Sequence, residues 1–404
     1  MRIAYITAHT PFGRGETFVL EEMLAVVELG VDLLIVPRNP PREVFHGSAR
    51  QISDRAIWLP LFNWQIFLYF LKAVALNLRL WGIIGRMICH SRTLKILVKN
   101  LAVVPKAIFV AGLLQKEPVD HIHAHWGSTT ASMAWVISEL TGIPWSFTLH
   151  RWDIAENNLL KLKVGRASFA RCINENGRRE VLQLVGETYY DKVKVIHMGV
   201  RLPEKAIIEL RPSRSEFVFA CPANLLPIKG HLFLIEACAL LVNRDIRNFR
   251  CLLIGEGPLE GEIRRQIAKL GLGEVVTLVG GLPHEELLQM YSHGEIDAVI
   301  LPSIVTDKGE KEGIPVALME AMAYGIPVVS TDTGGIPELL SGKAGIIVRE
   351  KDARELAEAI EKLMKEDKLR KEIGEAGRMR VRGYFNLVEN TRTLLEEIKR
   401  SGHR

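Results

Sequence analysis

The feature that most constrains this chain is an alternation of short apolar runs with helical patterns, which occurs in both halves. In the second half, six apolar runs are separated by segments of helical periodicity. Strands are expected at residues 217–223, 249–255, 275–280, 297–303, 327–331 and 344–348. Strands that alternate regularly with helices form a parallel sheet with right-handed crossovers. Because the first half repeats this layout, the sequence predicts an α/β protein with two Rossmann-like, doubly wound domains that face a cleft.

The length supports two domains, because 404 residues exceed what a single core usually holds. Residues 201–216 contain two prolines and no clear period, so we interpret them as a linker. An N-terminal domain is then expected at 1–200 and a C-terminal domain at 217–384. Residues 385–404 are predicted to form a C-terminal helix.

Cysteine usage and the N-terminus indicate the compartment. The five cysteines are odd in number and show no C-x-x-C spacing, which is typical of reduced thiols in a cytosolic protein. The N-terminal sequence enters a strand at once, without the charged and apolar regions of a signal peptide. These observations predict a cytoplasmic protein.

The positive charge of the chain is concentrated in residues 55–116. This segment has nine Lys or Arg and no acid, whereas the rest carries 43 basic and 47 acidic residues, a net charge of −4. Charge this local argues against a general nucleic-acid binder. The segment reads as long apolar helices, but its longest uncharged run, 56–71, is shorter than the about 20 residues that span a bilayer.

The basic residues of this segment suggest a membrane surface as a partner. Lys72, Arg79 and Arg86 recur every seven residues, which on one helix places them within about 40° of one another. A helix with cations on one side and Leu and Trp on the other can lie on anionic lipid. We therefore predict peripheral association with the inner face of the plasma membrane. The alternative is that these helices only cover the sheet, with their cations in solvent.

The most specific motif is EGIPVALMEAMAYGIPVV, which begins at Glu312. Glu312 is expected in the loop after a strand, and Glu320 about 1.5 turns into the following helix. The N-terminus of that helix offers N–H groups and a positive dipole end to a diphosphate. The residues expected to contact the same ligand are Gly313, Ile314 and Pro315, which follow Glu312. On its own, such a Glu pair is more often a loop acid and a surface helix acid.

This segment, with the TDTGGIPEL that follows, resembles the E-x7-E signature of retaining glycosyltransferases of family 4, also called group 1, which have the GT-B fold. The resemblance includes the Gly-x-Pro-Val-Val strand and the Gly-Gly-Ile-Pro-Glu turn. It implies that Glu312 lies against the donor sugar and that Glu320 lies against the nucleotide ribose. It also implies that the N-terminal domain binds the acceptor and that the C-terminal domain binds the nucleotide-sugar. By the same resemblance, the last helix crosses back to brace the N-terminal domain.

Two segments of the first half carry the same resemblance. WSFTLHRWDI matches the family's Phe-Thr-x-His-x-x-Asp-Ile pattern, which implies that His150 lies beside the transferred sugar; Asp153 belongs to the same pattern. GETFVLEEM is similar to the Ser-Glu-Thr-Phe loop of the polysaccharide-building branch, which faces the donor. Gly13 and Gly15 of this loop would let the backbone approach a phosphate, and a tight turn requires the same glycines.

A phosphate clamp is expected in ANLLPIKG, residues 223–230. The resemblance implies that Lys229 holds the diphosphate. Asn224 stands where family members usually carry Arg, so one of two cations is missing or comes from elsewhere. A second cation would contribute about 1–3 kcal/mol as a charge-assisted hydrogen bond. The turn that contains Gly255 is similar to the family's Gly-x-Gly-Pro turn.

Three histidines, His121, His123 and His125, would share one face of a strand and so raise the question of a metal site. No fourth ligand stands at a recognisable spacing, and we find no convincing D-x-D motif. A strand end near the acceptor cleft is the favoured interpretation. We therefore predict no metal and no cofactor other than the donor.

These observations predict a retaining, metal-independent glycosyltransferase of cell-surface polysaccharide biosynthesis. The donor would be a UDP- or GDP-sugar, and the acceptor a saccharide or a lipid-linked saccharide. An anionic membrane surface is an expected partner, and nucleic acid is not. Two alternatives remain on the same fold. A nucleotide-sugar epimerase would release free sugar, and a non-catalytic nucleotide-sugar-binding protein, which Asn224 would suit, would bind nucleotide without turnover.

Overall fold

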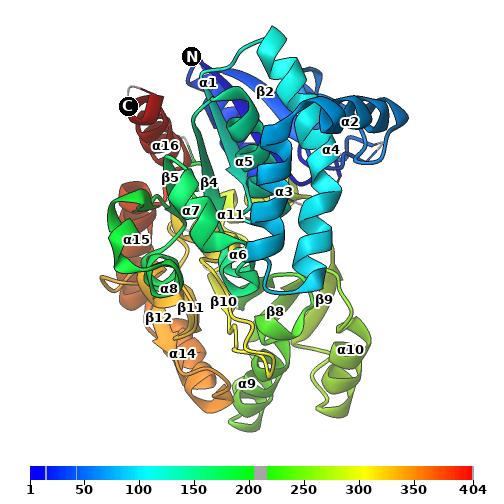
Figure 1. The fold of residues 1–404 in the computed structure, drawn as a ribbon. Coiled ribbons are helices and arrows are strands. Elements are labelled where there is room, and N and C mark those ends of the chain that lie inside the picture. The colour runs from blue at the N-terminus through cyan, green and yellow to red at the C-terminus, as the bar shows by residue number, and fades with distance from the viewer. Residues whose placement is uncertain (14–15, 42, 204–215, 403–404) are drawn as a thin grey trace. The chain divides into compact units, whose positions relative to one another are not determined.

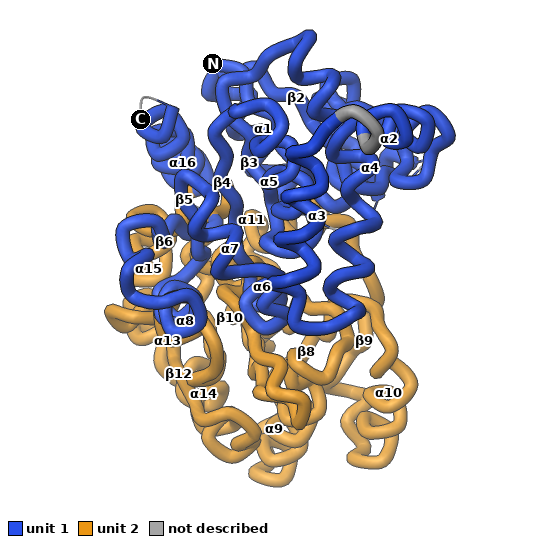
Figure 2. The backbone as a smooth tube through the Cα atoms, viewed as in Figure 1, with its two compact units in different colours: residues 1–198, 387–404 blue, residues 199–386 orange. Residues whose placement is uncertain are grey.

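The computed structural model describes residues 1–13, 16–41, 43–203 and 216–402. It divides into two compact units, residues 1–198 with 387–404 and residues 199–386 (Figure 2). Gly15 and most of the predicted linker, residues 204–215, lie outside the described residues.

Unit 1 is built on a six-stranded parallel sheet with the order β2-β1-β3-β4-β5-β6 (Figure 1). The strands are β1 (Arg2–Thr7), β2 (Asp32–Pro37), β3 (His121–His125), β4 (Trp145–Leu149), β5 (Phe169–Cys172) and β6 (Val193–Val195). The helices are α1 (Thr17–Glu28), α2 (Trp64–Leu76), α3 (Leu78–His90), α4 (Leu94–Lys116), α5 (Thr129–Thr141), α6 (Arg151–Glu156), α7 (Leu160–Arg166), α8 (Glu175–Val185) and α16 (Leu387–Gly402). Short 3-10 turns are η1 (Gly47–Gln51), η2 (Ser53–Arg55) and η3 (Glu187–Lys192).

The sheet of unit 1 is buried on both faces, as its near-continuous apolar strands require. Side chains alternate between the faces along each strand. In β1, Ile3 and Tyr5 join the core that α1 and α16 cover, and Ala4 and Ile6 join the core beneath α4 and α5. The chain thus returns through α16, which packs on α1 within unit 1.

Unit 2 has a second six-stranded parallel sheet, with the order β12-β11-β10-β7-β8-β9. The strands are β7 (Phe217–Pro222), β8 (Phe249–Ile254), β9 (Val276–Gly280), β10 (Ala298–Leu301), β11 (Val328–Thr331) and β12 (Ile346–Val348). The helices are η4 (Pro227–Lys229), α9 (His231–Asn243), α10 (Glu260–Lys269), α11 (His284–Ser292), α12 (Val316–Ala323), α13 (Ile336–Leu339), α14 (Ala353–Lys365) and α15 (Asp367–Tyr384). The strand order reverses between β7 and β10, and ligands of doubly wound sheets bind at the carboxyl ends of such strands.

The prediction that Lys72, Arg79 and Arg86 share one helix is wrong. Helix α2 ends at Leu76, and the side chain of Asn77 caps α3 by accepting a hydrogen bond from the Arg79 N–H at 3.1 Å. The two helices are bent by 105° at this break. Lys72 therefore lies on a different helix from Arg79 and Arg86, and Arg86 is tied to Glu139 of α5 at 2.9 Å.

Helix α4 is long and apolar enough to cross a membrane by length and composition, and α2 and α3 pass the same test if they are taken as one bent span. Within α4, half of the most apolar stretch of 18 residues is buried inside the structure. Its Lys106 reaches the backbone oxygen of Pro37 at 2.6 Å, just where β2 ends. Such burial is typical of a core helix of an α/β domain.

Candidate active site

The predicted cation and the first predicted acid meet in unit 2. Lys229 ends η4, the turn that follows β7, and Glu312 lies in the loop that follows β10. Because β7 and β10 are parallel neighbours, their carboxyl ends share one edge of the sheet. Lys229 Nζ lies 2.9 Å from Glu312 Oε2, with side chains 19% and 12% exposed. This edge therefore holds a partly buried ion pair.

Glycines with positive φ hold the backbone around this pair. Gly334 has φ +59°, and a Cβ there would lie 2.0 Å from the Glu312 carbonyl oxygen. Its neighbour Gly335 donates its N–H to the Gly313 carbonyl at 3.0 Å. The Gly-Gly turn of the motif thus packs directly on the loop that carries Glu312, which a larger residue at position 334 would displace.

The predicted Gly255 turn packs against the loop after β7. Gly255 has φ +149°, and a Cβ there would lie 2.1 Å from the Ala223 carbonyl oxygen. This contact places Gly255 beside Asn224, whose side chain is exposed. Asn224 brings no charge to the site, so Lys229 is the cation of this loop.

The second predicted acid, Glu320, lies inside α12, where it was expected. Its Oε1 lies 2.7 Å from Nε2 of His284 at the start of α11. Burial and the Glu320 carboxylate raise the pKa of Tyr291 well above its usual value.

Pro315, expected in the first helical turn, instead precedes the helix as its cap residue, and no side chain caps α12. The first N–H groups of α12 are therefore available to an acceptor.

Two buried residues near Lys229 were not found from the sequence. Within the described part of the chain, the ring nitrogens of His231 and the hydroxyl of Ser303 are buried without a hydrogen-bond partner. His231 opens α9 two residues after Lys229, and burial, with the Lys229 charge, lowers its pKa to about 4. In the sequence, a role for His231 near the site is indicated by its position directly after Lys229 and Gly230.

In unit 1, His150 directly follows β4, which ends at Leu149, and it is the N-cap residue of α6. Its backbone N–H donates to Asp153 Oδ2 at 2.9 Å, which fixes the turn. Its Nε2 lies 2.8 Å from Nε2 of His125, at the end of β3. The rings of Phe18 and Trp126 lie 5.3 and 4.4 Å from the imidazole, measured between centroids. Burial, with the charges of neighbouring side chains, lowers the pKa of His150 well below its usual value.

The other two histidines of β3 hydrogen-bond to hydroxyls of β4. His121 Nε2 and His123 Nδ1 each lie 2.8 Å from Ser146 Oγ, and His123 Nε2 lies 3.0 Å from Thr148 Oγ1. Across the residues that the structure describes, no three His, Cys, Asp or Glu side chains are arranged to hold a metal ion. Of the three histidines, His125 is the one at the end of the strand, and its ring contacts His150.

The loop with Gly13 is closed by Glu16. Gly13 has φ +82° and donates its N–H to the Glu43 carbonyl at 3.1 Å, so the turn itself requires glycine. Glu16 Oε2 accepts the N–H groups of His9 and Thr10 at 3.0 Å each, and Oε1 accepts from Trp126. Burial disfavours this carboxylate, but these hydrogen bonds outweigh it and lower the pKa of Glu16.

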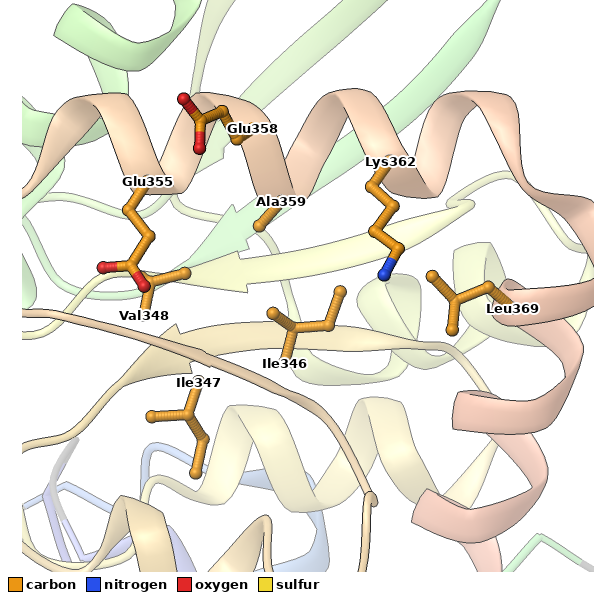
Figure 3. Close-up of a pocket in the computed structure, with 8 residues that line it drawn as sticks. All are labelled: Ile346, Ile347, Val348, Glu355, Glu358, Ala359, Lys362 and Leu369. Atoms are coloured by element: carbon orange, nitrogen blue, oxygen red, sulfur yellow. The ribbon is translucent and has the colours of Figure 1, made fainter.

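A pocket of about 250 Å³ opens elsewhere in unit 2, between β12 and α14 (Figure 3). Apolar side chains of β12 form its floor, and Glu355 and Lys362 of α14 border it (Figure 3). None of the predicted site residues lines it.

Comparison with known proteins shows which family part of the chain resembles. Residues 204–380 match the family described as "Glycosyl transferases group 1". AmsK of Erwinia amylovora, an amylovoran biosynthesis glycosyltransferase, is 27% identical over 99% of this chain and all of its own length. WcaL of Escherichia coli (strain K12), a candidate colanic acid biosynthesis glycosyltransferase, is 39% identical, but the alignment spans only 42% of this chain and 41% of WcaL.

Solved structures share the fold over nearly the whole chain. A glycosyltransferase from Rickettsia africae superposes with a TM-score of 0.71 at 20% identity, covering 99% of this chain and 98% of its own. Anabaena Alr3699/HepE, solved in complex with UDP, superposes with a TM-score of 0.73 at 17% identity, covering 99% of this chain and all of its own. The predicted fold is thereby confirmed. With its two doubly wound parallel sheets the chain has the GT-B fold of these solved structures, and its residues 204–380 are similar to the group 1 glycosyltransferases.

Proposed function

We propose that this protein transfers a sugar from a UDP- or GDP-linked donor to a saccharide or lipid-linked acceptor, with retention of configuration and without a metal ion. The observation that carries the proposal is the Lys229–Glu312 pair at the carboxyl edge of β7 and β10, inside the stretch that matches the family. Cell-surface polysaccharide assembly is the proposed setting, because AmsK and WcaL are named for amylovoran and colanic acid biosynthesis. A UDP donor is supported by the complexes of HepE with UDP and UDP-glucose.

In this proposal the donor diphosphate binds Lys229. The ammonium group then exchanges its carboxylate partner for phosphate oxygens, and Glu312 becomes free to accept hydrogen bonds from the sugar hydroxyls. As the bond from the anomeric carbon to the diphosphate breaks, charge develops on the leaving group. Lys229 and the N–H groups at the start of α12 would stabilise that charge. The new bond forms on the same face of the sugar, and the acceptor hydroxyl loses its proton to the leaving phosphate.

Glu320 is proposed to accept the ribose hydroxyls. Its carboxylate is 14% exposed, and His284 contacts one of its two oxygens, Oε1, at 2.7 Å. A carboxylate has about four lone-pair positions, so it can accept further hydrogen bonds. His150 is proposed to contact the transferred sugar from unit 1, and Gly13 to approach the donor.

Metal independence is proposed from the charges that the chain itself supplies. The diphosphate would meet an ammonium group and a helix N-terminus, both of which stabilise anions. These groups take the role that a divalent cation has in metal-dependent transfer.

Peripheral membrane binding on the cytoplasmic side is proposed for the surface of α2 and α3. Of the large apolar side chains exposed in the described structure, twelve lie between residues 58 and 98. The most exposed are Leu78 at 88%, Phe62 at 83% and Leu94 at 75%, followed by Trp64 at 69%. The same region contains no acid, and Lys72 and Arg79 stand next to these apolar side chains in the sequence. Exposed apolar groups combined with cations suit an anionic bilayer.

The proposal is tested by incubating the protein with labelled UDP- or GDP-sugars and lipid-linked saccharides extracted from cells. Label that moves into the lipid fraction is expected. Release of free sugar without an acceptor product would instead favour an epimerase, and nucleotide binding without any turnover would favour a binding protein.

A further inference from the structure

A path of buried polar side chains connects helix α1 to His150 within unit 1. Arg171 Nη1 lies 2.5 Å from Glu22 Oε2, and both side chains are almost fully buried. Tyr5 donates its hydroxyl proton to the other carboxylate oxygen, Oε1, and His125 Nδ1 lies 3.6 Å from that same oxygen. His125 Nε2 in turn lies 2.8 Å from His150 Nε2. His125 therefore lies between the Glu22–Arg171 pair and His150, and its longest contact in this series is the 3.6 Å to Glu22.

The surroundings of His125 Nδ1 decide which nitrogen of that ring carries the proton. Burial disfavours the Glu22 carboxylate, but Arg171 and the hydrogen bonds from His125 and Tyr5 outweigh it, so the pKa of Glu22 lies well below its usual value. Because Tyr5 gives its proton to Glu22, its oxygen offers only lone pairs to Nδ1, 3.5 Å away. Nδ1 thus faces two acceptors and must be the protonated nitrogen.

The contact between the two imidazoles then fixes the tautomer of His150. Nitrogens 2.8 Å apart share one proton. A neutral His125 that is protonated at Nδ1 has a lone pair at Nε2, so His150 donates from its own Nε2. This leaves the lone pair of His150 on Nδ1.

We propose that Glu22 and His125 are positioning residues that hold His150 in the Nε2–H tautomer, so that Nδ1 accepts a hydrogen bond from a sugar hydroxyl. The inference rests on the proposed function, in which His150 contacts the transferred sugar. Phe18 and Trp126 pack on the imidazole, and Asp153 fixes the turn that carries His150 by accepting its backbone N–H. A partner of this kind, behind a functional histidine, sets which nitrogen faces the substrate.

Glu22→Gln tests this arrangement with a residue of the same shape. Arg171 can only donate, so the amide oxygen of Gln must stay with it, and the NH₂ group takes the place of Oε1. The NH₂ group then donates toward His125 Nδ1, which has to accept. The proton of His125 moves to Nε2, and His150 becomes the acceptor at Nε2 with its proton on Nδ1. Both tautomers are therefore expected to invert.

NMR of the ligand-free protein labelled with ¹⁵N-histidine measures these tautomers. His150→Gln identifies the His150 signals, and His123, held by Ser146 and Thr148, is an internal reference. Wild type should show His150 protonated at Nε2, and Glu22→Gln should show it protonated at Nδ1. Glu21→Gln, which removes the same charge from the next position of α1, should leave His150 unchanged.

The wild-type spectrum is decisive even without a folded Glu22→Gln variant, since a His150 protonated at Nδ1 would overturn the proposal. His125→Phe gives a second test, because without an acceptor at Nε2 both tautomers of His150 should be populated. An unchanged single tautomer in either folded variant would also overturn it.

Turnover separates this inference from the proposed function. Glu22→Gln should lower kcat about tenfold to hundredfold with unchanged affinity for UDP or GDP, the usual size when a partner that orients a functional histidine is lost. Tautomer inversion with full kcat would contradict the use of Nδ1 by the sugar. Full turnover in His150→Ala would instead refute the role of His150 in the proposed function and leave the tautomer measurement untouched.

Discussion

Lys229 and Glu312 neutralise each other across 2.9 Å, so a phosphate that binds Lys229 has to displace a carboxylate. The exchange is feasible because neither side chain is fully buried and the freed carboxylate can hydrogen-bond to the sugar. Removing one partner of a buried pair would leave an uncompensated charge. The pair therefore links the binding of the diphosphate to the orientation of the acid that faces the sugar.

The Glu312→Gln variant should separate these two roles. It removes the charge that competes for Lys229, so affinity for UDP or GDP should stay equal or increase, whereas kcat should fall because the sugar loses an ionised acceptor. Calorimetry measures the affinity and steady-state assays the turnover. Glu310→Gln, two residues away in the same loop, is the matched control. Weaker nucleotide binding with undiminished turnover would show that the role is wrong.

The Glu320→Ala variant should weaken nucleotide binding by about 1–3 kcal/mol, the range for hydrogen bonds to a charged group. His284→Ala should have a smaller effect, because it removes only the partner that orients the carboxylate. Glu262→Ala, at an exposed position of α10, serves as the control. If calorimetry gives the same nucleotide affinity for Glu320→Ala and wild type, Glu320 does not bind the ribose.

At this scale the sequence could locate residues but not their partners. Spacing within a single motif predicted that Glu312 follows a strand and that Glu320 lies in a helix. The Glu22–Arg171 pair joins positions 149 residues apart, and only the assembled sheet brings them together. One signal was present, because Glu22 occupies an apolar face of α1 between Val19 and Met23 and is itself buried.

At the scale of elements, α2 and α3 carry the proposed membrane surface. Their cations are expected to contribute unequally to membrane binding, because Arg86 is paired with Glu139. Wild type should float with vesicles that contain anionic lipid and be released as salt rises. Lys72→Gln with Arg79→Gln should reduce flotation, whereas Arg86→Gln should not, because Arg86 is engaged by Glu139. A wild type that ignores anionic vesicles at low salt would eliminate the membrane proposal.

Helix α4 is fastened to the end of β2 by Lys106, whose ammonium donates to the backbone oxygens of Pro37, Arg38 and Leu59. Burial, with the nearby Arg38 charge, lowers the pKa of Lys106 to about 7. An unfolded lysine has a pKa of about 10.4, so between pH 7 and 10 the unfolded chain binds more protons than the folded one. The free energy of unfolding should therefore rise with pH in this window.

The Lys106→Met variant should lack this contribution. From pH 7 to pH 9, wild type should gain up to about 2 kcal/mol of unfolding free energy relative to the variant. Urea unfolding followed by tryptophan fluorescence at both pH values gives the comparison. Parallel pH dependence in the two proteins would mean that the folded lysine keeps its ordinary pKa.

Most strands could be predicted because they are short, nearly continuous apolar runs, as is typical of parallel strands buried on two faces. The exception is β3, which contains His121, His123 and His125. The break between α2 and α3 was not predicted from the spacing of the cations, because that seven-residue spacing continues across the break. Asn77 was the available signal, since Asn is a preferred N-cap residue and here ends one helix and caps the next. Spacing alone cannot show that a cation such as Arg86 faces an acid of α5.

At the scale of the whole molecule, the chain forms two doubly wound units and returns through α16 to the first. This return crossing was expected from the resemblance and not from periodicity, which shows only an amphipathic helix. The buried face of α16, with Leu394, Leu395 and Ile398, completes the core beside α1. Both ends of the chain thus belong to the unit that holds His150.

The central claim is that the Lys229–Glu312 site transfers sugar with retention and without metal. Proton NMR of the anomeric signals, with α-linked UDP- and GDP-sugars, cell-derived acceptor and excess EDTA, tests it most directly. Loss of the donor signal should be matched by a new α-glycoside in wild type and be strongly slowed in Glu312→Gln. A β-glycoside, free sugar alone, or activity that returns only with Mn²⁺ or Mg²⁺ would contradict the claim.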